Sequence, residues 1–188
     1  VLFKRGCEFR TNVSLNLKTG VSYGAYGTGE KPQILGSLKN YADSTWENVG
    51  NGVWKLSETI SGEAGVVTFD GDTAVGFRKF SVDSFVKYGD YFHDYKNDGS
   101  FYLYLGKTNP SDYFGSIEIG SFAGIALSGD NVSNITIENI AVKYAGNGFN
   151  MENGTNITIT GCEFSWIGGI VYEGGSTRFG NAITFWNK

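Results

Sequence analysis

The chain has 188 residues and a net charge of -4, and 40% of its residues are hydrophobic. This composition supports one hydrophobic core of ordinary size. A slightly acidic chain offers no basic surface for phosphates, and no apolar run approaches the roughly 20 residues of a bilayer span. We therefore expect neither a nucleic acid nor a membrane as a partner.

Residues 1–37 contain three short apolar segments separated by turn residues. The segments are "VLFKRGCEF" from Val1, "VSLNL" at 13–17 and "GVSYGAYG" at 20–27. Apolar and polar residues alternate in each, as in strands with one face in water. The glycine-rich stretch that follows lacks the GK[ST] of a phosphate-binding loop, so it is interpreted as a turn. We assign residues 1–37 to one coil of three strands.

Residues 38–114 show no such period. They contain apolar runs with "NG" and "DG" turns, as in "TWENVGNGVWKLS" and "GVVTFDG", which predict an inserted antiparallel β region. His93 stands alone, and "DYKNDGS" lacks the spacing of a calcium loop that ends in Glu. No CxxC motif or Cys/His cluster occurs, so we expect no metal and no cofactor.

Residues 115–188 contain a repeat. "NITIENIAV" at Asn134 is followed 22 residues later by "NITITGCEF" at Asn156, and "SIEI" (116–119) and "GIAL" (124–127) extend the pattern upstream. The alignment places apolar residues over apolar residues: Ile135 over Ile157, Ile137 over Ile159, Val142 over Phe164. Short strands of this kind bury their apolar faces only when successive repeats stack. Leucine-rich repeats need a leucine pattern that is missing here.

The sequence therefore predicts an all-β fold, a right-handed parallel β-helix with three strands per coil and a 22–24 residue period. The antiparallel β region of residues 38–114 is inserted into it, and residues 115–188 form further stacked coils. The chain opens without Met and stops at Lys188 directly after an apparent strand. We expect an amino-terminal piece of a longer protein, truncated at its C-terminus, with self-association through the exposed end of the β-helix.

Several segments carry a resemblance that covers nearly the whole chain. "LFKRGCEF", "VSYGAYGTGEKPQI", "GDYFHDYKNDGSFYLYLGKTNPSDYFGSIEIG" and "GGSTRFGNAITFW" resemble bacterial pectin-lyase-like β-helix proteins, a group of polysaccharide lyases and glycoside hydrolases. The resemblance implies a carbohydrate-active protein that is secreted or on the cell surface, with a polysaccharide as its partner. Enzymes of this group often carry their acids and bases in later coils, so these residues alone leave open whether the catalytic residues are present.

Outward polar residues on the predicted coils are the candidate catalytic groups. A hydrolase needs two carboxylates, and a lyase needs a base beside a sugar carboxylate neutralised by a cation. Residues one coil apart lie about 4.8 Å from each other, which allows either arrangement. The candidates are Lys143, Glu163, Glu173 and Arg178, the last two from an irregular loop. The alternative is a solvated face whose ion pairs contribute little.

A second group is predicted to bind the substrate. Asn150 and Glu152 lie on the third strand of a coil, and Trp186 follows the inward Phe185, so its ring faces outward as a sugar platform. Two function classes remain open. The first is part of a secreted polysaccharide-degrading enzyme, a lyase or a hydrolase. The alternative is a noncatalytic polysaccharide-binding or adhesin module of a bacterial surface protein, with a phage tail-spike segment as a third reading.

Overall fold

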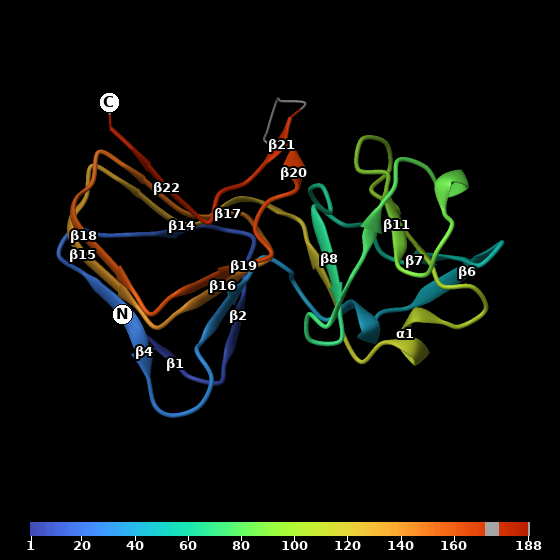
Figure 1. Ribbon diagram of the computed structural model, residues 1–188, viewed down its shortest axis with the longest axis horizontal. Helices are drawn as coiled ribbons and strands as arrows, with labels where there is room; N and C mark the ends of the chain where they lie inside the picture. The colour runs from blue at the N-terminus through green and yellow to red at the C-terminus, as the bar shows by residue number, and fades with distance from the viewer. Residues whose placement is uncertain (172–176, 188) are drawn as a thin grey trace.

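The computed structural model describes residues 1–171 and 177–187 (Figure 1). Strands dominate these residues, and their α-helical structure is limited to the single turn α1 (Pro110–Tyr113). Two 3-10 turns, η1 (Tyr41–Asp43) and η2 (Val82–Ser84), complete the helical content. The described part of the chain holds no helix with the length and apolar run that a bilayer crossing requires. The fold is all-β, as predicted.

Three four-stranded parallel sheets make up one half of the molecule (Figure 1). Sheet 1 contains β1 (Leu2–Lys4), β4 (Ser22–Tyr26), β15 (Ser133–Glu138) and β18 (Thr155–Thr160). Sheet 2 contains β2 (Glu8–Arg10), β5 (Gln33–Leu35), β16 (Ala141–Lys143) and β19 (Glu163–Ser165). Sheet 3 contains β3 (Leu15–Asn16), β14 (Phe122–Asp130), β17 (Ala145–Glu152) and β22 (Ile183–Trp186).

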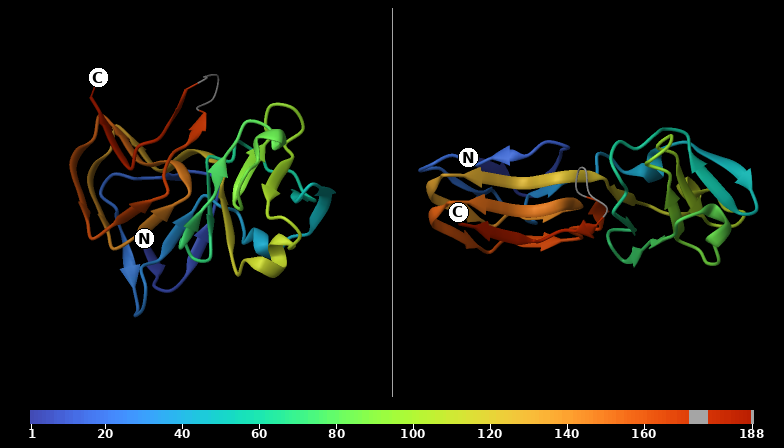
Figure 2. Two further views of the ribbon diagram at one scale, coloured as in Figure 1. Left: turned by 45° about the vertical axis from the view of Figure 1, so that its right-hand side comes forward. Right: turned by 90° about the horizontal axis from the view of Figure 1, so that it is seen from above.

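The chain visits sheets 1, 2 and 3 in this order four times. Each visit adds one strand to each sheet and so forms one layer: β1–β2–β3, β4–β5–β14, β15–β16–β17 and β18–β19–β22. The view from above in Figure 2 shows the layers lying over one another. Two layers run without interruption between sheets 2 and 3, whereas the other two carry additional chain at this corner. The insertion follows β5, and a hairpin of β20 (Ile170–Val171) and β21 (Arg178–Phe179) follows β19.

The predicted register of the repeat is confirmed. Ile135 pairs with Ile157, Ile137 with Ile159, and Val142 with Phe164 as neighbouring positions on adjacent parallel strands. The bends repeat as well, because residues with left-handed backbone angles recur at the same spacing. They are the pairs Asn131 and Asn153, Asn134 and Asn156, Asn139 and Gly161, Tyr144 and Trp166. Asn and Gly tolerate these angles better than other residues, which explains their places in the sequence.

The insertion forms the other half of the molecule and contains two further sheets. The larger sheet has the order β10 (Phe77–Arg78), β11 (Asp90–His93), β12 (Phe101–Tyr104), β7 (Val53–Leu56), β6 (Trp46–Gly50), and all of its pairs are antiparallel except β10–β11. The smaller sheet contains β13 (Ile117–Gly120), β8 (Val66–Phe69) and β9 (Ala74–Val75).

One strand differs from the expected pattern. "SIEI" was predicted to belong to the repeat, but β13 pairs antiparallel with β8. Its residues Ile117 and Ile119 are fully buried against the insertion. The alternation of Ile and Glu is common to both kinds of strand, so periodicity alone did not separate them. The parallel repeat resumes at β14, which pairs with β17 and β3.

Two separate hydrophobic cores follow from this division. One lies inside the three parallel sheets and includes Ile137, Val142 and Phe149. The other lies in the insertion and includes Phe101, Leu103 and Ile119. Each half therefore has its own set of fully buried side chains, and the contacts that join the two halves are made by residues outside these cores.

The inward column predicts a graded response to truncation. Ile137 is fully buried between Tyr23 and Ile159, whereas Ile159 itself lies on the outermost strand and is only half-buried. We expect Ile137→Ala to lower the free energy of unfolding by about 3 kcal/mol, because it leaves a cavity. Ile159→Ala should cost clearly less. Denaturant unfolding of both variants checks this, and equal losses would contradict the stacked column.

Candidate functional site

The residues that the sequence singles out lie in three different places. Lys143 and Glu163 lie on sheet 2, Arg178 lies on the β20–β21 hairpin, and Asn150, Glu152 and Trp186 lie on sheet 3. Glu173 is outside the described residues. The structure therefore does not bring the predicted catalytic group and the predicted binding group together.

Lys143 is engaged by the insertion. Its Nζ donates to Oδ2 of Asp72 at 2.9 Å, and the hydroxyl of the adjacent Tyr144 donates to Oδ1 of the same carboxylate at 2.5 Å. Burial raises the pKa of Asp72, but the hydrogen bonds from Tyr144 and Lys143 outweigh it, and the pKa is lowered. Burial and the same bond raise the pKa of Tyr144. Lys143 thus fixes the turn between β8 and β9 to sheet 2.

Arg178 has a similar structural partner. Its Nε and Nη2 donate to Oε1 of Glu63 at 3.0 and 2.5 Å, and Arg78 donates to the same oxygen. The other oxygen of Glu63 accepts the backbone N–H of Val171 at 2.7 Å. The side chain of Glu63 is only 2% exposed. Burial raises its pKa, but the Val171 amide and the two arginines outweigh this, so the pKa of Glu63 is lowered.

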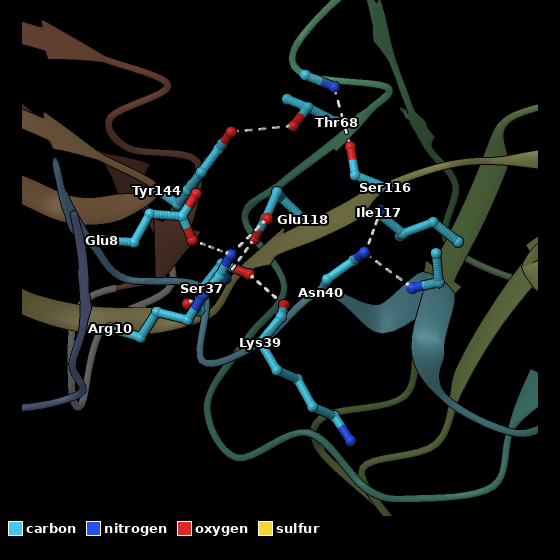
Figure 3. A network of polar contacts seen from close by, with 12 residues as sticks. Glu8, Arg10, Ser37, Lys39, Asn40, Thr68, Ser116, Ile117, Glu118 and Tyr144 are labelled. Carbon is cyan, nitrogen blue, oxygen red and sulfur yellow. Dashed lines mark hydrogen bonds and ion pairs between the residues drawn. The ribbon is translucent and has the colours of Figure 1, made fainter. Parts of the chain in front are cut away.

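A third contact of this kind joins Arg10 to Glu118 (Figure 3). The guanidinium of Arg10 on β2 donates to both carboxylate oxygens of Glu118 on β13, at 2.8 and 2.9 Å, and also to the carbonyl of Ser37 at 3.0 Å. Two parallel charge-assisted hydrogen bonds make this pair stronger and more specific in geometry than a single contact would. The hydrogen bond to Glu118 raises the pKa of Arg10 despite its burial. The carboxylates of Asp72, Glu63 and Glu118 thus connect the insertion to the rest of the molecule.

Sequence reasoning missed these three carboxylates. Asp72 and Glu63 lie in the region without a repeat, and Glu118 lies in "SIEI", which the sequence wrongly assigned to the repeat. Their partners outside the insertion are 71 to 115 residues away along the chain. A contact at such a separation leaves no local pattern. The one available signal concerned Glu118, which lies between Ile117 and Ile119 in an alternating segment.

Glu163 lies on the outer face of sheet 2, beside a small pocket of about 170 Å³ that Lys143 also lines. The two residues are offset along the strands, since Glu163 pairs with Ala141 and Lys143 pairs with Ser165. Oε1 of Glu163 accepts a hydrogen bond from the hydroxyl of Ser165 at 3.2 Å. The pocket brings the two predicted residues close, but the ammonium of Lys143 is directed to Asp72.

Asn150, Glu152 and Trp186 do come together. All three line one pocket of about 200 Å³ on the outer face of sheet 3, together with Asn147 and Thr184. Asn150 pairs with Thr184 and Glu152 pairs with Trp186 on the next strand. Alternation explains this arrangement, because the intervening Phe149 and Met151 are fully buried. Trp186 lines this pocket and is 58% exposed, whereas Phe185, predicted to point inward, lies beside the buried Phe149 but is 55% exposed because β22 is the end strand of sheet 3.

The same outer face extends to the layer below. Asp130 on β14 pairs with Glu152, and Ser128 pairs with Asn150. The column of Glu152 and Trp186 and the column of Asn150 and Thr184 therefore each continue with a polar residue. We call the residues Ser128, Asp130, Asn150, Glu152, Thr184 and Trp186 the polar ladder. Asp130 was not singled out from the sequence. The repeat spacing of 22 residues would have found it, since it places Asp130 under Glu152 just as it places Asn131 under Asn153.

No metal centre is evident in the part of the chain that the structure describes. Nowhere among those residues do three or more His, Cys, Asp or Glu side chains gather in a way that could hold an ion. His93, the single histidine of the sequence, is buried in the insertion and accepts the N–H of Ala64 at its Nδ1. The chemistry of the polar ladder therefore rests on amide, hydroxyl and carboxylate groups with one indole ring.

The buried carboxylate Glu63 leads to a stability prediction. Glu63→Gln leaves two arginines without their anionic partner, and we expect a loss of about 3 kcal/mol in unfolding free energy. Glu58→Gln is the matched control, because the Glu58–Lys39 pair is largely exposed and such pairs contribute under about 1 kcal/mol. Chemical denaturation of both variants measures the difference, and similar small losses would contradict the structural role of Glu63.

The lowered pKa of Glu63 also sets a pH dependence. Its stabilising effect is complete above the unfolded-state value of 4.5 and is lost as the pH falls through the lower native value. The melting temperature of the wild-type protein should therefore drop towards that of Glu63→Gln as the pH is lowered below 4.5. A pH series of melting curves for both proteins tests this. A difference that stays constant across the series would rule out Glu63 as its source.

Comparison with known proteins adds no relative. No protein-family model, no curated protein and no solved structure matches the chain. The resemblance to pectin-lyase-like proteins stays a prediction from the residues that carry it. Any account of function accordingly rests on the geometry of the polar ladder, the pocket on sheet 2 and the surfaces of the insertion.

Proposed function

We propose that the three parallel sheets form a right-handed parallel β-helix and that the protein binds a polysaccharide along the polar ladder of sheet 3. The parallel pairing of all twelve strands and their fixed order support the β-helix. The right hand follows from the strong preference for right-handed crossovers between parallel strands of one sheet.

One observation carries the proposed binding function. Asn150 and Glu152 of β17 line the same pocket as Thr184 and Trp186 of β22, although β18, β19, β20 and β21 lie between β17 and β22 in the chain. Hydroxyl groups of a sugar need donors and acceptors at close spacing, and an exposed indole packs against the apolar face of a sugar ring. Stacked strands repeat such groups about every 4.8 Å, which suits a polymer better than a single sugar.

Binding is favoured over the elimination chemistry of a lyase. A lyase would use a free base and a free guanidinium, and the candidates for these roles were Lys143 and Arg178. Both are held by carboxylates of the insertion instead, Lys143 by Asp72 and Arg178 by the buried Glu63. A noncatalytic module of a secreted or surface-bound bacterial protein, or the binding face of a larger enzyme, fits this arrangement.

A glycoside hydrolase is the second candidate, and a specific pair favours it. Asp130 and Glu152 are directly paired on adjacent parallel strands of sheet 3, and both point away from the core. Neighbouring strands lie about 4.8 Å apart, and retaining hydrolases place their two carboxyl groups about 5 Å apart. Trp186 on the next strand would form the wall of a sugar subsite beside them.

The binding proposal is tested by removing the indole ring. We expect Trp186→Ala to weaken polysaccharide binding about tenfold, because an aromatic contact contributes about 1 kcal/mol beyond its buried area. Asn150→Ala should weaken it less, through the loss of hydrogen bonds. Affinity electrophoresis across a panel of neutral and acidic polysaccharides identifies the ligand and ranks the variants.

Tyr26→Ala is the control for Trp186→Ala. Tyr26 is also an exposed aromatic residue near a strand end, at 49% exposure, but it lies on sheet 1. Its loss should leave retardation in the gel unchanged. If Tyr26→Ala and Trp186→Ala reduce binding equally, or if no polysaccharide of the panel binds the wild-type chain, the proposed role of the polar ladder is wrong.

Hydrolysis is tested with the same panel. If Asp130 and Glu152 are catalytic, the wild-type chain releases reducing ends, and both Asp130→Asn and Glu152→Gln lower the rate at least about 100-fold. Glu138→Gln is the control, since Glu138 is an exposed carboxylate of sheet 1. Formation of unsaturated uronates at a rate that Asp130→Asn and Glu152→Gln leave unchanged would indicate a lyase. Absence of both products leaves binding as the function of this chain.

A further inference from the structure

The larger sheet of the insertion has one buried face and one face that is partly open. Along β11 and β12 the residues alternate: Tyr91 and His93 are buried, as are Phe101 and Leu103. Phe92 and Tyr102 lie between them, and Asp94 and Tyr104 directly follow them; all four are only half-buried. A sheet that needs no cover would carry charged or small polar residues at such positions. This face nevertheless carries the aromatic rings of Phe92, Tyr102 and Tyr104, and the packing of the core does not require them there.

These rings line a hollow on the surface of the insertion. It has a volume of about 440 Å³, within the range of ligand pockets, and Asp83 of η2 and the following Phe85 are among the residues that line it. The rings of Phe92 and Tyr102 are nearly parallel, with centroids 6.1 Å apart and 13° between their planes. Phe85 and Tyr104 lie 6.2 Å apart at 45°. We call this hollow, lined by Asp83, Phe85, Phe92, Asp94, Tyr102 and Tyr104, the aromatic groove.

Among the described residues that line the aromatic groove, the charged ones are Asp83 and Asp94, and none is Lys or Arg. One cation lies just beside the groove, because Nζ of Lys55 on the neighbouring strand is 5.8 Å from the centroid of the Tyr102 ring. Aromatic faces carry negative electrostatic potential and attract cations within about 6 Å. Two carboxylates beside four aromatic rings therefore favour a ligand that has a flat apolar face and a positive charge.

We propose that the aromatic groove binds a glycan that carries free amino groups, with the sugar face on Phe92 and Tyr102 and the protonated amine towards Asp83 and Asp94. The choice of a sugar amine over other amines rests on the proposed polysaccharide function. The site itself is independent of the polar ladder, because it lies on the insertion and shares none of its residues.

Other occupants fit the groove less well. A purely apolar partner would cover two carboxylates without compensating their charge, which is costly. A nucleic acid or an acidic polymer would bring further negative charge to the same place. An unmodified neutral sugar could pack on the rings, but it would leave the carboxylates without a cation. An amino sugar satisfies both the rings and the charges.

The experiment compares oligosaccharides of glucosamine, N-acetylglucosamine and glucose with the same linkage and length. Titration calorimetry with the wild-type chain should show binding of the glucosamine oligosaccharide, weakened about three- to fivefold or more by N-acetylation, since the cation is then absent. Tyr102→Ala should remove the binding, and Tyr102→Phe should retain most of it. Asp83→Asn should weaken it by a similar three- to fivefold, and added salt should weaken it as well.

Asp43→Asn is the matched control for Asp83→Asn. Both aspartates are exposed and lie in the first turn of a 3-10 helix, but Asp43 belongs to η1 and is not in the groove. It should leave the affinity unchanged. Melting curves of all variants show whether the fold is retained, and the Tyr102→Phe variant keeps the test valid if Tyr102→Ala unfolds.

Two outcomes would overturn the inference. One is equal affinity for the glucosamine and glucose oligosaccharides, which would mean that the charge plays no part. The other is loss of glucosamine binding in Trp186→Ala but not in Tyr102→Ala, which would place the ligand on the polar ladder. A failure of the polar ladder to bind any polysaccharide leaves the groove result unaffected, because the groove variants are scored on their own ligand.

Discussion

The structure depends on the vertical alignment of inward side chains in successive layers. Ile137 lies between Tyr23 and Ile159 on adjacent strands, and Val142 lies between Ile34 and Phe164. Because alternate residues of a strand face opposite sides, a shift of one position would expose the whole apolar column to water. The register is therefore strongly specified, and every outward residue acquires a defined neighbour in the next layer.

The corners enforce this alignment. Asn134 and Asn156 occupy equivalent bends with left-handed backbone angles, and Nδ2 of Asn156 donates to Oδ1 of Asn134 at 2.6 Å. A side chain that satisfies its counterpart one layer away fixes the relative height of the two bends. The polar ladder inherits its spacing from the same geometry. Its residues need no packing of their own to stay in place.

The two halves of the molecule are joined by a different kind of contact. Glu63, Asp72 and Glu118 are largely buried and paired with cations on sheet 2 or on the β20–β21 hairpin. Buried ion pairs add little net stability compared with apolar contacts, but they tolerate only one geometry, because an unpaired buried charge is costly. These pairs therefore set where the insertion lies more than how stable the fold is. The same ion pairs engage Lys143 and Arg178, which the sequence alone predicts to be catalytic residues.

Much of the parallel half could be predicted from the sequence, since the Asn-Ile-Thr-Ile repeat determines strands, direction and register together. The outward position of Trp186 followed from alternation with Phe185, and the convergence of Asn150 and Glu152 followed from the same rule. The insertion was predicted only as an antiparallel region, and the parallel β10–β11 pair within it was missed. Its partners are distant in the chain, so no local pattern specifies which charge meets which, and Lys143 was assigned to catalysis for this reason.

Both departures from the repeat occur at one corner, between sheets 2 and 3. The second layer leaves there after β5 and returns at β14, and the fourth leaves after β19 and returns at β22, whereas the third crosses the same corner with Tyr144 alone. Extra chain at this vertex does not disturb the stack, because the strands on either side keep their neighbours. This corner is therefore a position at which whole chain segments can be inserted or exchanged while the column of stacked residues stays the same.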